Sequence, residues 1–259
     1  MLQLHPLKRF GQNFLTDQNT INKIIAEFDP KTEETVIEIG PGRAALTGRL
    51  LKIVKNFYAV EIDKKVAAEL KENFPELNLI VDDFLTIDFL SFIPSTSNEV
   101  RVIGNIPYNI TSSIIFKLIE NRDIVSDAML MVQYEVAKRI ASNKNSKDYG
   151  ILSVILGYFA EIRLCFQVSR NVFYPKPNVD SAIIHLKFRK DLDNELDNDL
   201  FIKLVKTAFG KRRKTLKNSL RNSIFDSAFI NNSVVDLTLR AEQLDIKDFI
   251  NLTKQFQSK

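Results

Sequence analysis

The strongest constraint on the fold is an alternation, starting near residue 35, between short apolar runs and longer helical patterns. Five runs are typical of buried strands: 35–39, 57–62, 77–81, 100–105 and 128–132. Helical patterns cover 44–53, the stretch up to about 74, 111–120 and 133–142. Since apolar strands that alternate with helices form a parallel sheet covered on both faces, we expect an α/β domain.

The remainder of the chain departs from this alternation. Two apolar runs, 153–166 and 181–188, suit a final pair of strands, for which an antiparallel arrangement is open. The stretch 191–199 holds five acidic residues and no base, which is typical of an exposed linker. From 197 onward, apolar residues recur at the spacing of one helix face. We therefore expect an α/β domain over 1–190 and a small all-helical domain over 191–259.

Composition excludes several classes of protein. With 45% hydrophobic and 26% charged residues, the chain is of the ordinary globular type. No apolar run approaches the ~20 residues of a membrane span, and the N-terminus lacks the layout of a signal peptide, so we expect a cytoplasmic protein without a membrane partner. One cysteine and two histidines exclude a disulfide and leave little room for a metal site, so we expect no metal.

A Gly-Pro-Gly turn at 40–42 follows the first strand of the alternation and precedes a helix. Glycine lets the backbone turn tightly and lets a ligand come close. Glu61 stands 21 residues after Gly40 at the end of the next strand, where a carboxylate can accept hydrogen bonds from two ribose hydroxyls. The alternative is a structural turn with a solvent-facing glutamate.

This turn loosely fits a dinucleotide fingerprint, G-x-G-x-x-A, but two of its residues oppose a phosphate. Pro41 has no N–H to donate, and a charged Glu38 would repel the ligand. A nucleoside with a cationic centre and no phosphate fits better, which predicts S-adenosylmethionine as the cofactor. Asp83 is the candidate acceptor for the adenine amine; Asp82 competes with it, and either residue could simply cap a turn.

The tetrad Asn105-Ile106-Pro107-Tyr108 follows the fourth strand of the alternation. Pro107 favours an extended Ile106 and so directs its carbonyl, while Asn105 offers a second carbonyl and Tyr108 a ring. Two acceptors and a stacking ring can hold a planar aromatic amine such as the N6 group of adenine. Catalysis would then rest on positioning and electrostatics, without a strong general base. Taken alone, the tetrad also fits an ordinary turn with a buried tyrosine.

Two further segments suggest a nucleic-acid substrate. The stiff loop at 173–177, FYPKP, can present Phe173 to the other face of a base taken out of its stack, although a phenylalanine in this context often fills a core. The run 211–221 has six bases and no acid. Such a run is either a solvated face or a set of contacts to nucleic-acid phosphates.

Together these segments resemble the ribosomal RNA small-subunit adenine-N6 dimethyltransferase family. Six motifs carry the resemblance in order along nearly the whole chain: KRFGQNFL (8–15), EIGPGRAALT (38–47), VEID (60–63), NIPYNI (105–110), VFYPKPNVDSA (172–182) and AFGKRRKTLKNSL (208–220). The chain departs from the family at Ala44, where glycine is usual, and at Ile106, where leucine is commoner. Ala44 lies past the two glycines expected to face the cofactor, so we expect binding to be kept.

The resemblance implies a Rossmann-like methyltransferase sheet and the dimethylation of two adjacent adenosines in the 3′-terminal hairpin loop of small-subunit rRNA. The implied partners are this rRNA and the assembling small ribosomal subunit, and we expect a monomer. The implied cofactor contacts are Asn13, Leu15, Gly40, Glu61, Asp83 and Asn105. The implied catalytic residues are Asn105, Pro107, Tyr108 and Phe173. The expected RNA contacts are Lys8, Arg9, Lys211, Arg212, Arg213, Lys214 and Lys217.

Three alternatives stay open on the sequence. A large-subunit rRNA adenine methyltransferase of the antibiotic-resistance type shares the tetrad, but the VFYPKP and KRRKTLKNSL segments fit it less well. A non-catalytic ribosome-assembly or transcription factor could use the same scaffold, against which the intact tetrad argues. An NAD oxidoreductase lacks a candidate histidine or lysine for hydride transfer.

Overall fold

The computed structural model describes residues 13–93, 99–211, 213–221 and 233–258. The predictions on Lys8, Arg9 and Arg212 fall outside these ranges. The chain divides into two compact units, of which the first comprises 1–137 with 163–190 and the second 138–162 with 191–259. The chain passes from the first unit to the second at 190–191, which is where the sequence places the domain boundary. The segment 138–162, expected in the first domain, instead groups with the C-terminal residues.

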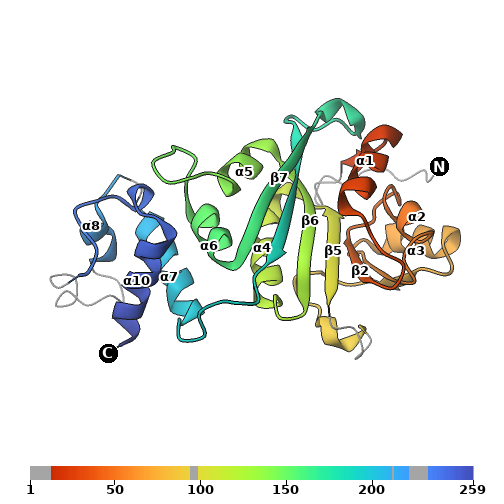
Figure 1. The fold of residues 1–259 in the computed structure, drawn as a ribbon. Helices are drawn as coiled ribbons and strands as arrows, with labels where there is room; N and C mark the ends of the chain where they lie inside the picture. The colour runs from red at the N-terminus through yellow and green to blue at the C-terminus, as the bar shows by residue number, and fades with distance from the viewer. Residues whose placement is uncertain (1–12, 94–98, 212, 222–232, 259) are drawn as a thin grey trace. The chain divides into compact units, whose positions relative to one another are not determined.

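The central feature of the first unit is a mainly parallel sheet (Figure 1). Its strands, in spatial order, are β4 (Asn78–Ile80), β3 (Asn56–Val60), β2 (Thr35–Ile39), β5 (Val100–Asn105), β6 (Val125–Gln133), β9 (Ser181–Phe188) and β7 (Ala160–Val168). The first five are parallel, and β9 runs antiparallel to β6. The α/β fold expected from the alternation is confirmed, and so is the Rossmann-like sheet that the family resemblance implies.

The helices of this unit are α1 (Gln18–Phe28), α2 (Thr47–Leu50), α3 (Lys64–Asn73), α4 (Thr111–Glu120) and, where the chain passes from one unit to the other, α5 (Tyr134–Ile140). The last two begin within one residue of the predicted starts at 111 and 133, whereas α1 is not predicted by the sequence patterns. Side chains cap two of them, since Asp17 accepts from the N–H of Thr20 and Asp63 from that of Lys65. Short 3-10 helices occupy Phe89–Ser91, Tyr108–Ile110 and Arg170–Val172. The expected helix 44–53 is reduced to α2, Thr47–Leu50; at its N-terminal side, the left-handed backbone of Ala44, φ 61°, keeps this residue out of the helix.

The register of β2 and β5 brings two distant turns together. These strands are parallel neighbours, with Ile39 paired to Gly104, so the turns that follow them emerge side by side at the carboxyl edge of the sheet. Strand order reverses here, which is where open α/β sheets bind ligands. Gly104 permits the close approach: a Cβ on it would lie 2.8 Å from the carbonyl oxygen of Ile39.

The opposite edge of the sheet is held by a partly buried ionic network. Arg101 at the start of β5 donates to both carboxylate oxygens of Asp127 on β6, at 2.7 and 2.9 Å, and to Glu34 at 2.9 Å. It also donates to the carbonyl of Phe28, the last residue of α1. His185 of β9 contacts the same Asp127. Burial opposes ionisation of Asp127, yet these partners hold its pKa below the usual range.

A two-stranded ribbon joins the N-terminal segment to the FYPKP loop. It pairs β1 (Phe14–Leu15) with β8 (Phe173–Tyr174), and Leu15 lies opposite Phe173. Both of these side chains belong to the main hydrophobic core. The ribbon therefore anchors the loop that carries Phe173 to the segment that carries Asn13.

The second unit is helical. Among its described residues, the helices are α6 (Ile151–Phe159), α7 (Asn198–Phe209), α8 (Leu216–Leu220) and α10 (Ile246–Gln257), with a short 3-10 helix at Ala241–Gln243. The expectation of a strand throughout 153–166 is wrong in its first half, because α6 covers this stretch up to Phe159. Tyr158 of α6 packs on Phe201 of α7 with ring centroids 4.8 Å apart. This packing explains why 138–162 joins the C-terminal residues.

Candidate active site

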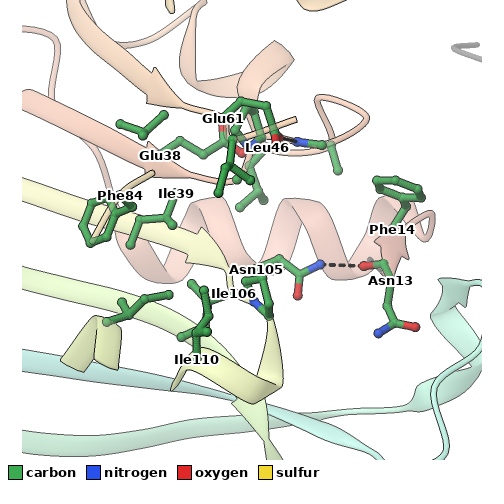
Figure 2. A pocket seen from close by; sticks show the side chains of 18 of the residues that line it. Asn13, Phe14, Glu38, Ile39, Leu46, Glu61, Phe84, Asn105, Ile106 and Ile110 are labelled. Carbon is green, nitrogen blue, oxygen red and sulfur yellow. Dashed lines mark hydrogen bonds between the residues drawn. The ribbon is translucent and has the colours of Figure 1, made fainter. Parts of the chain in front are cut away.

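A cavity opens at the carboxyl edge of the sheet, where β2, β3 and β5 end (Figure 2). It is lined by Asn13, Phe14, Leu15, Glu38, Ile39, Gly40, Pro41, Gly42, Arg43, Ala45, Leu46, Val60, Glu61, Ile62, Asp82, Asp83, Phe84, Asn105, Ile106, Pro107, Tyr108, Ile110 and Ile114. The Gly-Pro-Gly turn, Glu61 and the tetrad therefore share one cavity, although they are far apart in the sequence.

The Gly-Pro-Gly turn is built on left-handed backbone. Gly40 and Gly42 have φ angles of 62° and 53°, a region that favours glycine. The N–H of Gly40 donates to the carbonyl of Val60, which ties the turn to β3. A Cβ on Gly42 would lie 3.1 Å from the ring of Phe14. Glycine at this position leaves a narrow space between the turn and the N-terminal segment.

Glu38 lies beneath this turn and is fully buried. Burial, aided by the nearby Glu61, raises its pKa to about 8, although a 2.7 Å hydrogen bond from the Thr47 hydroxyl opposes the shift. The carboxyl group is therefore mostly protonated at neutral pH. This corrects the sequence argument that the charge of Glu38 would repel a phosphate; the argument from Pro41 is unaffected.

Glu61 is also buried, and its two oxygens face different backbone donors. One accepts from the N–H of Asp63 at 2.9 Å and the other from the N–H of Gly42 at 3.3 Å. Burial raises the pKa of Glu61, and these two hydrogen bonds oppose the shift. The carboxyl group thus lies between the turn and the end of β3, as the spacing predicts.

Asp82 and Asp83 both line the cavity, so the choice between them stays open. Asp83 accepts from the N–H of Leu85 at 2.9 Å, as the alternative of a turn cap requires, and Asp82 accepts from the N–H of Asp83. Phe84 and Ile62 line the same region, and the sequence motifs do not predict them as site residues. Ile62 is 47% exposed, which gives the cavity an apolar surface beside Glu61.

The tetrad is held from two sides. The side-chain amide of Asn105 donates to the carbonyl of Asn13 at 2.8 Å, so Oδ1 is the acceptor that this amide presents (Figure 2). The hydroxyl of Tyr108 lies 2.7 Å from that of Ser181. Burial raises the pKa of Tyr108, which keeps its phenol neutral. Pro107 is extended, with φ −61° and ψ 133°, and precedes the short 3-10 helix Tyr108–Ile110.

Phe173 does not join this arrangement. Its side chain is 5% exposed, packs in the core with Leu15, and is not among the residues that line the cavity. The expectation that it faces a bound base is therefore not met in this conformation, because strand pairing with Leu15 turns it into the core. The alternative of a core-filling phenylalanine describes its position.

The described part of the basic segment belongs to the second unit. Lys211, Arg213, Lys214 and Lys217 are all exposed. In α8, Lys217 faces solvent while Leu216 and Leu220 are buried, so the helix presents its charge outward. This exposure fits both a solvated face and a set of phosphate contacts.

Neither a metal site nor a membrane span is found in the part of the chain that the structure describes. The described residues contain no group of three or more His, Cys, Asp or Glu side chains that could hold a metal ion. None of the helices among them has the length and apolarity to cross a bilayer.

Comparison with known proteins decides the family. The family described as "Ribosomal RNA adenine dimethylase" matches residues 5–258. The chain belongs to this family. A relative from Chlorobium phaeobacteroides (strain DSM 266), "Ribosomal RNA small subunit methyltransferase A", is 44% identical over 250 residues, covering 96% of this chain and 91% of its own. The chain is thus similar to that protein over almost its full length.

Solved structures agree with this adenine dimethylase membership. A dimethyladenosine transferase from Plasmodium falciparum has a TM-score of 0.79 at 27% identity, covering 95% of this chain and 98% of its own. The 23S rRNA methyltransferase ErmE has a TM-score of 0.68 at 26% identity, with coverages of 95% and 100%. The protein is an S-adenosylmethionine-dependent methyltransferase, as the Gly-Pro-Gly turn and Glu61 predict.

Proposed function

We propose that this adenine dimethylase transfers methyl groups to N6 of two adjacent adenosines, dimethylating each, in the 3′-terminal hairpin loop of small-subunit rRNA. The 44% identity to a protein named for the small subunit, against 26% to a 23S rRNA methyltransferase, supports the small-subunit substrate. The proposed physiological partner is the assembling small ribosomal subunit, and the proposed compartment is the cytoplasm.

The cavity suits S-adenosylmethionine because it presents hydrogen-bond acceptors for the nucleoside and a glycine turn that leaves room for it. Glu61 offers a carboxylate to the ribose hydroxyls, Asp83 an acceptor to the adenine amine, and Gly40 a backbone without a side chain. Asn13 and Leu15 close the N-terminal side of the same space. When bound, S-adenosylmethionine supplies an electrophilic methyl group on a sulfonium. The buried acids Glu38 and Glu61 act on the rest of the cofactor and so leave this centre reactive.

The tetrad holds the target amine. Oδ1 of Asn105 and the carbonyl of Ile106 accept the two N–H bonds of adenine N6, so that its lone pair becomes more localised and points at the methyl carbon. The ring of Tyr108 stacks on the base, and Pro107 fixes the carbonyl direction. The N–C bond forms as the S–C bond breaks, and the amine proton, acidic after transfer, leaves to solvent. Positioning supplies the catalysis.

Phe173 enters this proposal as the second ring of the base clamp, in a conformation other than the one described. Because it is packed against Leu15, stacking on a base requires the FYPKP loop to turn this side chain out of the core. The exposed neighbour Tyr174, at 59%, shows that the ribbon already faces solvent on its other side.

We assign RNA binding to basic side chains. These are the exposed Lys211, Arg213, Lys214 and Lys217, together with Lys8, Arg9 and Arg212. These side chains neutralise phosphates without reading sequence. Shape then selects the folded hairpin.

The observation that carries the proposal is the hydrogen bond from Asn105 to Asn13, since it ties the tetrad to the wall of the cofactor cavity. The test incubates purified protein and S-adenosylmethionine with small subunits or large subunits that lack adenine dimethylation, then maps the products by mass spectrometry. We expect dimethyladenosine at two adjacent positions near the 3′ end of small-subunit rRNA. Methylation confined to large-subunit rRNA, or no methylation of either, would overturn the proposal.

A further inference from the structure

A second pocket in the first unit is linked to the active site through Ser181. Tyr108 lines the cofactor cavity and its hydroxyl contacts that of Ser181, which is fully buried. Ser181 is in turn paired across the β6–β9 ladder with Gln133, which lines the second pocket. The nucleotide next to a target base stacked on Tyr108 is therefore a candidate occupant of this pocket.

The lining of the second pocket combines an apolar surface with hydrogen-bonding groups. It consists of Gln133, Tyr134, Glu135, Arg170, Asn178, Val179 and Asp180. Val179 is 40% exposed and Tyr134 is partly exposed, so both offer surface to a flat ligand. Arg170 offers a guanidinium plane, on which unstacked bases also pack. The carboxylate of Glu135 accepts hydrogen bonds but donates none.

Hydrogen bonds hold the frame of this pocket in place. The carboxylate of Asp180 accepts from the backbone N–H of Arg170 at 3.0 Å and from the side chain of Gln167 at 2.9 Å. The carbonyl of Asp180 accepts from the N–H of Tyr134, also at 3.0 Å. Arg170 donates to the carbonyl of Asn178 at 2.7 Å. The loop before β9 is thus pinned to both flanking segments, which preforms the pocket.

We propose that this pocket binds the base of the nucleotide next to the target adenosine, and that Glu135 selects a base with an exocyclic amine. The inference rests on the proposed function. The base packs against Tyr134 and Val179, and its amine donates to Glu135. A base whose edge presents only carbonyl oxygens binds less well, because its acceptors then face the acceptor oxygens of the Glu135 carboxylate.

The experiment keeps one adenosine of the adjacent pair as the target and places adenosine or purine riboside, which lacks the 6-amino group, beside it on the 5′ or the 3′ side. Single-turnover methylation is measured at saturating S-adenosylmethionine and is mapped to the kept adenosine alone, because purine riboside itself offers no amine to methylate. The proteins are the wild type, Glu135→Ala, and the matched control Glu120→Ala, whose side chain is exposed on α4 and lies outside this pocket. Circular dichroism and cofactor affinity check that each variant is folded.

For the wild type and Glu120→Ala, we expect the rate to fall about fivefold to tenfold when the amine is removed on one side of the target, as for the loss of one hydrogen bond. Glu135→Ala reacts equally slowly with both RNAs. The inference is overturned, while the proposed function stands, if the wild-type rate is unchanged when the amine is removed on either side of the target. It is also overturned if Glu135→Ala still methylates the two RNAs at different rates. A wild type that methylates no RNA, the unsubstituted hairpin included, overturns the proposed function itself.

Discussion

Ala44 tests how the cofactor turn is built, because it is an alanine in left-handed backbone, φ 61°, held by its N–H bond to the carbonyl of Pro41. For an L-residue this conformation costs about 1–2 kcal/mol. Replacement by glycine removes that cost but increases the entropy of the unfolded chain, which opposes the gain by about 0.4–1 kcal/mol. The first effect is larger, so Ala44→Gly raises the free energy of unfolding by about 0.5–1 kcal/mol.

The assay is urea unfolding followed by circular dichroism and tyrosine fluorescence, since the chain has no tryptophan. The matched control is Ala45→Gly, because Ala45 does not have a positive φ. This control loses about 0.4–1 kcal/mol through the unfolded-state entropy. Ala44 and Ala45 both pack against the core, so both variants also lose a partly buried methyl group, and the difference between them isolates the left-handed strain. Ala44 does not line the cavity, so its replacement leaves cofactor affinity unchanged. If both variants lose the same stability, the left-handed conformation carries no strain and the reasoning is refuted.

Three further predictions concern the switch point, a buried acid and the basic segment. Gly104→Ala forces β2 and β5 apart at Ile39 and lowers stability by about 1–3 kcal/mol, with weaker cofactor binding by calorimetry. The pKa of Glu38 is raised from 4.5 to about 8 in the folded state, so between these pH values the folded chain keeps a proton that the unfolded chain loses. The free energy of unfolding of the wild type therefore falls as pH rises from 4.5 to 8, and Glu38→Gln abolishes this pH dependence. Arg213→Ala and Lys217→Ala each weaken RNA binding and reduce its salt slope by about one, whereas an unchanged slope would favour a solvated face.

The sequence predicts strands β2 to β6 and β9 because each is a continuous apolar run bounded by turn residues, whereas the two-residue strands β1 and β8 contain no such run and are not predicted. The runs 35–39 and 100–105 coincide with β2 and β5. The run 153–166 misled because its first half, α6, is rich in β-branched and aromatic residues and is buried on most sides. A helix without a polar face shows no helical period in its apolar residues. Its helical state depends on packing against the C-terminal helices, where Phe201 contacts Tyr158 and Phe159, and no local pattern encodes these contacts.

Within the site, the sequence predicts the residues that a turn or a strand end fixes locally. Gly40, Glu61 and Asn105 lie in the cavity because strand register alone brings their strand ends together. The position of Phe173 depends on pairing with Leu15, more than 150 residues earlier, which no local pattern encodes. The protonation of Glu38 likewise depends on burial beneath the turn. Arg101, Asp127 and His185 meet only through sheet order.

The central claim is that Asn105 holds the amine of the target base in the same cavity that binds the cofactor. Its most direct test is the single-turnover methylation rate of Asn105→Ala, measured beside cofactor and RNA affinities, with Asn109→Ala as the control because that exposed asparagine lies in the same motif outside the cavity. The account predicts that Asn105→Ala loses transfer while RNA binding is mostly kept, and that Asn109→Ala stays active. An Asn105→Ala enzyme that transfers methyl groups at the wild-type rate would contradict it.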